Sequence, residues 1–99
     1  MENVIEVVIF KLKVGASASD FLSLSDKFQK AYLSKCKGYI SRKLAIKDDT
    51  WIDTVVWKTM DDAKNAMNSA YESAIFQEFG ALIDVEACNA EHYTIKQSY

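Results

Sequence analysis

The chain has 99 residues, of which 49% are hydrophobic and 26% are charged, and this length and composition predict one folded domain over residues 1–99. The formal net charge is -2, and the basic residues at positions 35, 37, 42 and 43 form no continuous stripe, so they are expected on a solvated surface. No nucleic-acid partner is therefore expected, because binding to nucleic acid depends on clustered Lys and Arg side chains.

The first third of the chain predicts a central strand followed by a helix. Residues 4–12 are apolar on both faces apart from Glu6 and Lys11, a pattern typical of a strand that is covered on both sides. Ser17 and Asp20 form a capping-box-like start to a helix. Gly38 is placed to end that helix in a left-handed turn. The predicted inner stripe of the helix consists of Phe21, Leu24, Phe28, Ala31 or Tyr32, and Cys36.

The remaining residues predict a hairpin, a second helix and a last strand. Strands at 39–46 and 50–57 are joined by polar residues that suit a tight turn. Thr59 and Asp62 can cap a second helix, whose inner stripe is predicted to run from Met60 to Ala74, with a short apolar turn at 75–80 after it. A final strand is expected at 90–95. The order β-α-β-β-α-β predicts an α+β, ferredoxin-like fold with an antiparallel four-stranded sheet.

Cysteine spacing and hydropathy indicate which kinds of site and which cellular location are expected. Cys36 and Cys88 form no CxxC pair, which argues against a zinc site or a redox dithiol and predicts two free thiols. No apolar run reaches the ~20 residues that cross a bilayer, and the first residues lack the basic start of a secretory signal. We therefore expect a cytoplasmic protein with no membrane partner. A domain this small would also gain burial from a second subunit, so a homodimer is expected.

Four segments of the chain together resemble a known family. They are the opening strand from Ile5 to Gly15, the entry to the second strand from Gly38 to Arg42, the change from strand to helix between Asp53 and Thr59, and the closing Glu91-His92-Tyr93. The sequence resembles the dimeric α+β barrel proteins, and within them the antibiotic biosynthesis monooxygenase-like group. The resemblance covers nearly the whole chain, and its motifs are mainly structural.

The resemblance implies both an assembly and an activity. Two subunits would face each other through their sheets to form a barrel with the helices outside. A ligand would bind in each subunit between sheet and helices. Oxygen would be activated with no metal, flavin or other cofactor, because the substrate supplies the electrons. Small electron-rich aromatic compounds, phenolic or anthrone-like, are the substrates that the resemblance implies.

The haem-degrading branch of these proteins is not expected to include this chain. That branch relies on an Asn on the first strand, a Trp on the second helix and a His shortly after it. Aligned by hand on Gly15, Trp57 and Phe76, those positions fall at Val8, Ala66 and Gly80. None of these three residues can donate the required hydrogen bonds or bind the iron.

Three polar residues on apolar strands are the candidates for chemistry, because a buried polar group is costly unless it is paired. Glu6, Asp53 and His92 are predicted to meet on one face of the sheet. A carboxylate beside an imidazole favours the charged imidazole and creates a general base that works near neutral pH. The alternative is that His92 forms a structural link with a carboxylate or lies in water at the barrel rim. A single imidazole cannot assemble a His-rich metal site, so no metal is expected.

A further group of aromatic and apolar side chains is predicted to bind the substrate, although the same spacing also suits a filled core. Trp51, near the hairpin, is instead expected at the dimer edge. Three function classes stay open. They are a cofactor-independent monooxygenase, a small-molecule-binding or stress-related barrel protein without chemistry, and a purely structural dimerisation module. The predicted substrate-binding residues are Trp57, Tyr32, Met67, Tyr71 and Phe76.

Overall fold

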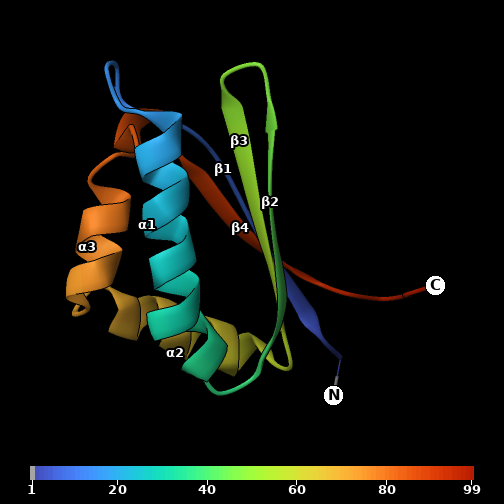
Figure 1. Ribbon diagram of the computed structural model, residues 1–99. Helices are drawn as coiled ribbons and strands as arrows, with labels where there is room; N and C mark the ends of the chain where they lie inside the picture. Colours follow the sequence, from blue (N-terminus) through green and yellow to red (C-terminus); the bar gives the residue numbers. More distant parts are fainter. Residues whose placement is uncertain (1) are drawn as a thin grey trace.

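The computed structural model describes residues 2–99 and contains four strands, three α-helices and two short 3-10 turns (Figure 1). The predicted order of strands and helices is confirmed, with small differences at the ends. In chain order the elements are β1 Val4–Lys11, α1 Ala18–Ala31, η1 Leu33–Lys35, β2 Tyr39–Lys47, β3 Thr50–Trp57, α2 Met60–Ala70, α3 Ala74–Gly80, η2 Val85–Ala87 and β4 Asn89–Thr94.

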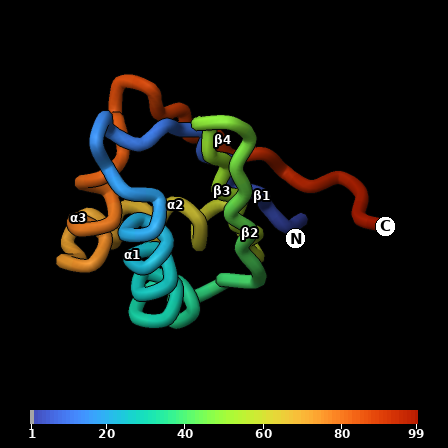
Figure 2. Tube along the Cα trace, turned by 45° about the horizontal axis from the view of Figure 1, so that its top comes forward, coloured from blue at the N-terminus to red at the C-terminus, as the bar shows by residue number. Residues whose placement is uncertain are grey.

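The strands form one sheet with the order β2-β3-β1-β4, and every neighbouring pair is antiparallel. This is the ferredoxin-like arrangement predicted from the sequence. All three helices lie on the same face of the sheet, and the C-terminal residues extend away from it (Figures 1 and 2). No helix within residues 2–99 is long and apolar enough to cross a membrane.

Side chains alternate along β3, and this alternation decides what the helices cover. Trp51, Asp53, Val55 and Trp57 are buried, while the residues between them are only half-buried. On the neighbouring central strand, Glu6 pairs with Val55, so its side chain belongs to the same covered face. The opposite face of these two strands has no helix above it.

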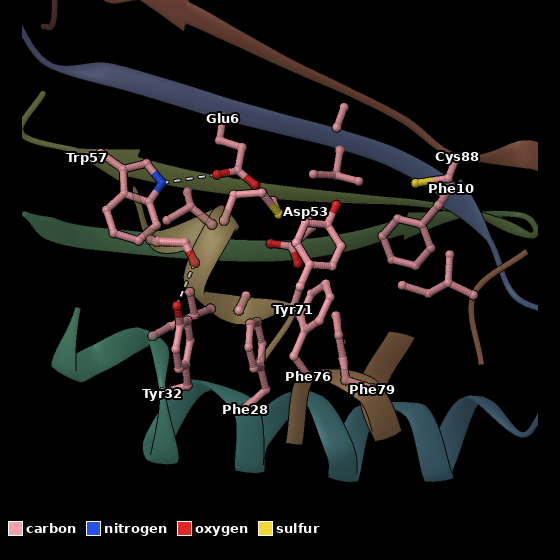
Figure 3. Close-up of a pocket in the computed structure, with 18 of the residues that line it drawn as sticks. Glu6, Phe10, Phe28, Tyr32, Asp53, Trp57, Tyr71, Phe76, Phe79 and Cys88 are labelled. Atoms are coloured by element: carbon pink, nitrogen blue, oxygen red, sulfur yellow. Dashed lines mark hydrogen bonds between the residues drawn. The ribbon is translucent and has the colours of Figure 1, made fainter. Parts of the chain in front are cut away.

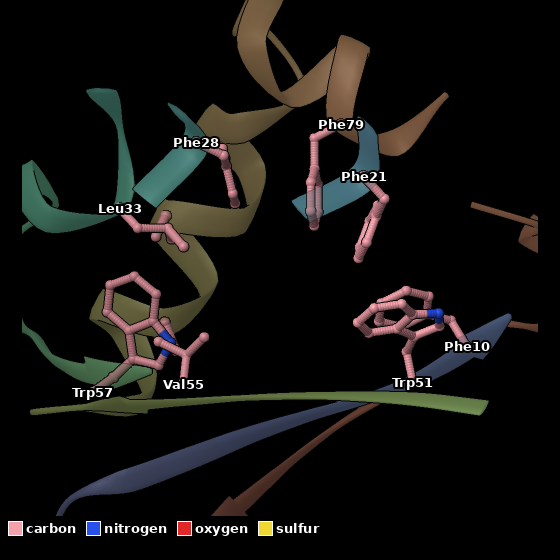
Figure 4. Close-up of a cluster of buried hydrophobic side chains, with 10 residues drawn as sticks. Phe10, Phe21, Phe28, Leu33, Trp51, Val55, Trp57 and Phe79 are labelled. Carbon is pink, nitrogen blue, oxygen red and sulfur yellow. The ribbon is translucent and has the colours of Figure 1, made fainter. Parts of the chain in front are cut away.

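The core between sheet and helices is aromatic. Phe21 of α1 lies 5.0 Å from Phe79 of α3 and 5.1 Å from Trp51, measured between ring centroids (Figure 4). Trp51 also stacks on Phe10 at 6.4 Å and is only 5% exposed. The prediction that Trp51 lies at a dimer edge is therefore wrong, because its position in the β3 alternation turns it under α1.

Side-chain caps begin the two longer helices where the sequence predicts them. The Ser17 hydroxyl accepts a hydrogen bond from the backbone N–H of Asp20 at 3.2 Å, and the Thr59 hydroxyl accepts one from Asp62 at 3.0 Å. The end of the first helix differs from the prediction. α1 stops at Ala31, a 3-10 turn follows, and Gly38 lies in the turn into β2 with φ +84.

The second predicted helical stripe is split into two helices. α2 ends at Ala70, and tight backbone hydrogen bonds from Glu72 to Ser69 (3.1 Å) and from Ser73 to Ala70 (2.9 Å) close its last turn. α3 then starts in a new direction, which brings Phe79 to 5.1 Å from Phe28. In this arrangement the two rings are stacked, with an interplanar angle of 15°. Ala74 therefore belongs to α3, and the expected short turn at 75–80 is a helix.

Two glycines with the same backbone conformation provide a stability test. Gly15 and Gly38 have φ of +85 and +84, but an added Cβ would meet nothing within 4 Å at Gly15 and would lie 2.6 Å from the Cβ of Asp62 at Gly38. We expect Gly15→Ala to cost about 1 to 2 kcal/mol from left-handed strain, and Gly38→Ala to cost about 1 to 3 kcal/mol more from crowding. Urea unfolding of both variants measures the difference, and equal losses would contradict the close approach.

Candidate functional site

A cavity of about 230 Å³ lies between the sheet and the helices. One wall comes from the covered face of the sheet and the other from the three helices (Figure 3). Every site residue predicted from the sequence lines this cavity. These residues are Glu6, Tyr32, Asp53, Trp57, Met67, Tyr71, Phe76 and His92.

Glu6 is the most enclosed ionisable group of the sheet wall. Its residue is 5% exposed, and its Oε1 atom accepts a hydrogen bond of 3.2 Å from the indole Nε1 of Trp57 (Figure 3). Burial raises the pKa of the Glu6 carboxyl, while His92 and the Trp57 N–H oppose that rise and the Asp53 carboxylate adds to it. The Glu6 carboxyl therefore holds a proton more readily than a surface carboxyl does.

His92 stands opposite Glu6 in the pairing of β1 with β4. Its Nε2 atom lies 3.5 Å from Oε1 of Glu6, yet it is buried and makes no hydrogen bond with any atom of residues 2–99. The rim position considered from the sequence does not fit this burial. Nε2 is therefore a buried polar atom at the cavity wall whose hydrogen-bonding capacity is not used by residues 2–99.

Asp53 has a different partner from the one predicted. Arg42 of β2 donates two parallel hydrogen bonds to its carboxylate, from Nε at 3.0 Å and from Nη2 at 2.8 Å. The Arg42 side chain is only 6% exposed, so the prediction of a solvated position is wrong for this residue. The cause is the hairpin register, which places Arg42 diagonally across from Asp53 on the covered face.

The Arg42 guanidinium also contacts the helices. Nη1 donates to the backbone carbonyl of Ser25 at 3.4 Å, and Cζ lies 5.9 Å and 5.7 Å from the ring centroids of Phe28 and Phe79. The sequence contains one signal for this contact. An acidic residue inside an apolar strand requires a cation, and Arg42 is the basic residue that the adjoining strand presents on that face.

The helix wall is aromatic and mostly uncharged. The Tyr32 hydroxyl donates to the backbone carbonyl of Ala66 at 2.5 Å, and burial raises the pKa of Tyr32 to about 12, so the phenol stays neutral. Tyr71 lies at the mouth of the cavity with 62% of its surface exposed. Several lining residues were assigned only to the core or to no role from the sequence, among them Phe28, Phe79, Ala70 and Cys88.

No group of three or more His, Cys, Asp and Glu side chains within residues 2–99 is arranged to hold a metal ion. The two cysteines in this part of the chain, Cys36 and Cys88, are free thiols.

Comparison with known proteins gives matches of structure only. No protein-family model and no curated protein matches the sequence. Solved structures with the same fold include a mutant of SnoaB, a cofactor-independent oxygenase from Streptomyces nogalater, with a TM-score of 0.79 and 18% identity over 99% of this chain and 97% of that chain. The chain has the fold of antibiotic biosynthesis monooxygenases.

Two other structures of this fold extend the comparison. The monooxygenase from the gene ActVA-Orf6 of Streptomyces coelicolor, in complex with Nanaomycin D, has a TM-score of 0.74 and 15% identity over 99% of this chain and 91% of that chain. A proposed antibiotic biosynthesis monooxygenase from Bordetella bronchiseptica has a TM-score of 0.73 and 17% identity over 98% of this chain and 100% of that chain. At these identities the likeness establishes the fold.

The Arg42–Asp53 pair gives a test of how the cavity wall is held. Replacing Arg42 by Met leaves the Asp53 carboxylate buried without its cation, and we expect a loss of about 3 to 5 kcal/mol in the free energy of unfolding. The double variant Arg42→Met, Asp53→Leu should recover most of that loss. Urea unfolding provides the measurement.

The exposed pair of Lys30 and Asp26 is the matched control. Its side chains are 75% and 61% exposed and lie 2.9 Å apart, so Lys30→Met should cost no more than about 0.5 kcal/mol. A loss in Arg42→Met no larger than in this control would contradict the buried pair.

Proposed function

We propose that the protein is a cofactor-independent monooxygenase that acts on a small aromatic compound, phenolic or anthrone-like. One observation carries the proposal. A cavity with aromatic walls encloses the Glu6 carboxylate beside a His92 ring nitrogen that has no hydrogen-bond partner within residues 2–99. Such a site combines a surface for a planar ring with groups that can take a proton.

The chemistry needs only the substrate, dioxygen and a base. His92 Nε2, supported by the charge of Glu6 3.5 Å away, takes the proton of a ring hydroxyl or of the enol of an anthrone. The resulting anion is electron-rich and transfers an electron to dioxygen, and the two radicals combine. The product is a peroxide anion on the ring carbon, which takes back the proton held by His92. Loss of the remaining C–H proton and cleavage of the O–O bond then release water, so that a CH₂ group of the keto form and O₂ become C=O and H₂O. The substrate thus supplies the electrons that reduce the second oxygen atom.

The apolar lining supports this proposal in a second way. Phe28, Phe76 and Phe79 give the cavity an apolar wall, and dioxygen, which is itself apolar, partitions into such surroundings. SnoaB is described as a cofactor-independent oxygenase, and the Streptomyces coelicolor protein as a monooxygenase with a bound ligand. These descriptions concern proteins of low identity, and they support the proposal through the shared fold.

A second candidate is a binding or stress-related protein with the same cavity and no chemistry. The observation that favours it is that the polar side chains of the sheet wall already bond to one another. Trp57 donates a hydrogen bond to Glu6, and Arg42 donates to Asp53, so these groups also have structural roles. Such a protein would bind an aromatic ligand without consuming oxygen.

His92→Ala separates the two candidates. We expect oxygen uptake with 2-naphthol, recorded with an oxygen electrode, to fall about 100-fold or more, because the variant lacks the proton acceptor. Glu91→Ala is the matched control, since Glu91 is the preceding residue of β4 and pairs with Val7 on the other face of the sheet. Circular dichroism should be unchanged in both variants.

Two outcomes would count against the enzyme. Ligand binding without oxygen uptake in the wild-type protein would favour the binding protein. Loss of folding in His92→Ala would favour a structural link between His92 and Glu6.

We also propose a cytoplasmic homodimer, in which a second copy covers the uncovered face of the sheet. Branched and aromatic side chains lie on that face among the polar residues Thr54, Asn89 and Glu91, and no helix lies over it (Figure 2). Ile9 is 43% exposed and Tyr93 is 54% exposed. A solvated sheet face is normally polar, so this surface favours a partner. The apolar residues of this face include Ile5, Val7, Ile9, Ile52, Val56 and Tyr93.

Native mass spectrometry tests the dimer. The expected mass is twice the 11.2 kDa of one chain. Val7→Lys introduces a charge at the centre of the uncovered face and should shift the population to monomer, with circular dichroism unchanged. Ser23→Lys, on the exposed side of α1, is the matched control and should remain a dimer. A monomeric wild-type protein would contradict the proposal.

A further inference from the structure

The cavity has a charge pattern that restricts what it can bind. Glu6, Asp53 and His92 are the acidic and imidazole groups among its lining residues, and no Lys or Arg is among them. Arg42 is the nearest cation, but its guanidinium is occupied by Asp53 and by the Ser25 carbonyl. The His92 imidazole is therefore the one lining group that could carry a positive charge, and Glu6 already lies 3.5 Å from it, so a negatively charged ligand would enter without a cation of its own to pair with.

The cost of such an anion follows from its surroundings. It would lose its hydration in a cavity whose helix wall is made of Phe28, Phe76, Phe79 and other apolar groups. It would also approach the carboxylate of Glu6, and like charges in a poorly hydrated site repel strongly. An uncharged ligand avoids both costs.

The polar wall offers a hydrogen-bonding position to an uncharged hydroxyl. Both recorded contacts of the Glu6 carboxylate, from Trp57 and from His92, are made by its Oε1 atom. The Nε2 atom of His92 is buried without a hydrogen-bond partner within residues 2–99. A ring hydroxyl that reaches this wall can donate to Glu6 or to His92, whereas a methoxy group cannot donate to either.

The volume limits the ring system. The cavity measures about 230 Å³. An apolar cavity of about 150 Å³ holds a benzene molecule, and sites for drug-sized ligands start at about 300 Å³. One ring or two fused rings fit between these bounds.

We propose that the cavity selects uncharged aromatic hydroxy compounds of one or two rings and rejects their carboxylated counterparts. This inference deepens the proposed function, on which it rests for the place of the ligand, and it narrows the substrate class from phenols and anthrones in general. The residues that make the selection are Glu6, which repels anions, and His92, which accepts the hydroxyl proton in a hydrogen bond.

Four ligands with the same two-ring body test the selection by calorimetry at neutral pH. They are 2-naphthol, 2-methoxynaphthalene, 2-naphthoate and 2-naphthylmethylammonium. Wild-type protein should bind 2-naphthol at least about tenfold more tightly than 2-naphthoate, a difference of about 1.4 kcal/mol, and more tightly than the methoxy compound. Equal binding of naphthol and naphthoate, tightest binding of the ammonium compound, or binding of none of them would overturn the inference.

A substitution at Met67 tests the cause of the selection. Met67 lines the cavity and is half-buried on α2, so a longer polar side chain can keep its end near the mouth. Met67→Lys supplies the missing cation and should reduce the preference for naphthol over naphthoate about tenfold, whereas Met67→Gln should leave the preference unchanged. An equal effect of both variants would overturn the electrostatic explanation, and circular dichroism checks that both are folded.

These binding measurements separate the inference from the proposed function. Selective binding of naphthol without oxygen uptake would contradict the proposed monooxygenase activity and support the proposed ligand selection. Oxygen uptake by a protein that binds naphthoate as tightly as naphthol would support the monooxygenase activity and contradict the ligand selection.

Discussion

The buried pair of Arg42 and Asp53 connects the sheet to the helices that close the cavity. Its two hydrogen bonds, 3.0 Å and 2.8 Å long, join β2 to β3. The same guanidinium reaches the Ser25 carbonyl on α1 and lies over the Phe28 and Phe79 rings. Because a buried carboxylate without a cation is costly, this pair favours the arrangement of strand, α1 and α3 in which the cavity is formed.

The pairing of the central strand then decides which polar groups meet. Glu6 has Val55 on one side and His92 on the other, so its carboxylate and the imidazole lie next to each other on the covered face. Trp57 reaches the same carboxylate from the end of β3. Since Arg42 neutralises Asp53, Glu6 is the carboxylate that dominates the electrostatics of the cavity, and its raised pKa follows mainly from burial.

Local patterns in the sequence were sufficient for the elements, and less so for contacts between them. The caps at Ser17 and Thr59 and the apolar spacing of the helices predicted the fold, because these signals act within a few residues. The burial of Trp51 and the ion pair of Arg42 depend on the hairpin register and on the helix above it. The direction of α3 likewise brings Phe79 onto Phe28, which lies in a distant part of the chain.

The candidate site was predictable because a polar residue on an apolar strand is recognisable from the sequence even when its partner is not. On β1, apolar residues do not alternate with polar ones, because both faces of this strand carry apolar side chains. Val4, Glu6 and Phe10 face the helices, while Ile5, Val7 and Ile9 face the other way. A strand that lines a ligand cavity on one face and carries a branched apolar surface on the other must be apolar on both. Ligand binding and the proposed subunit association would thus use alternate residues of the same strand, and a substitution on either face should be judged by its effect on both.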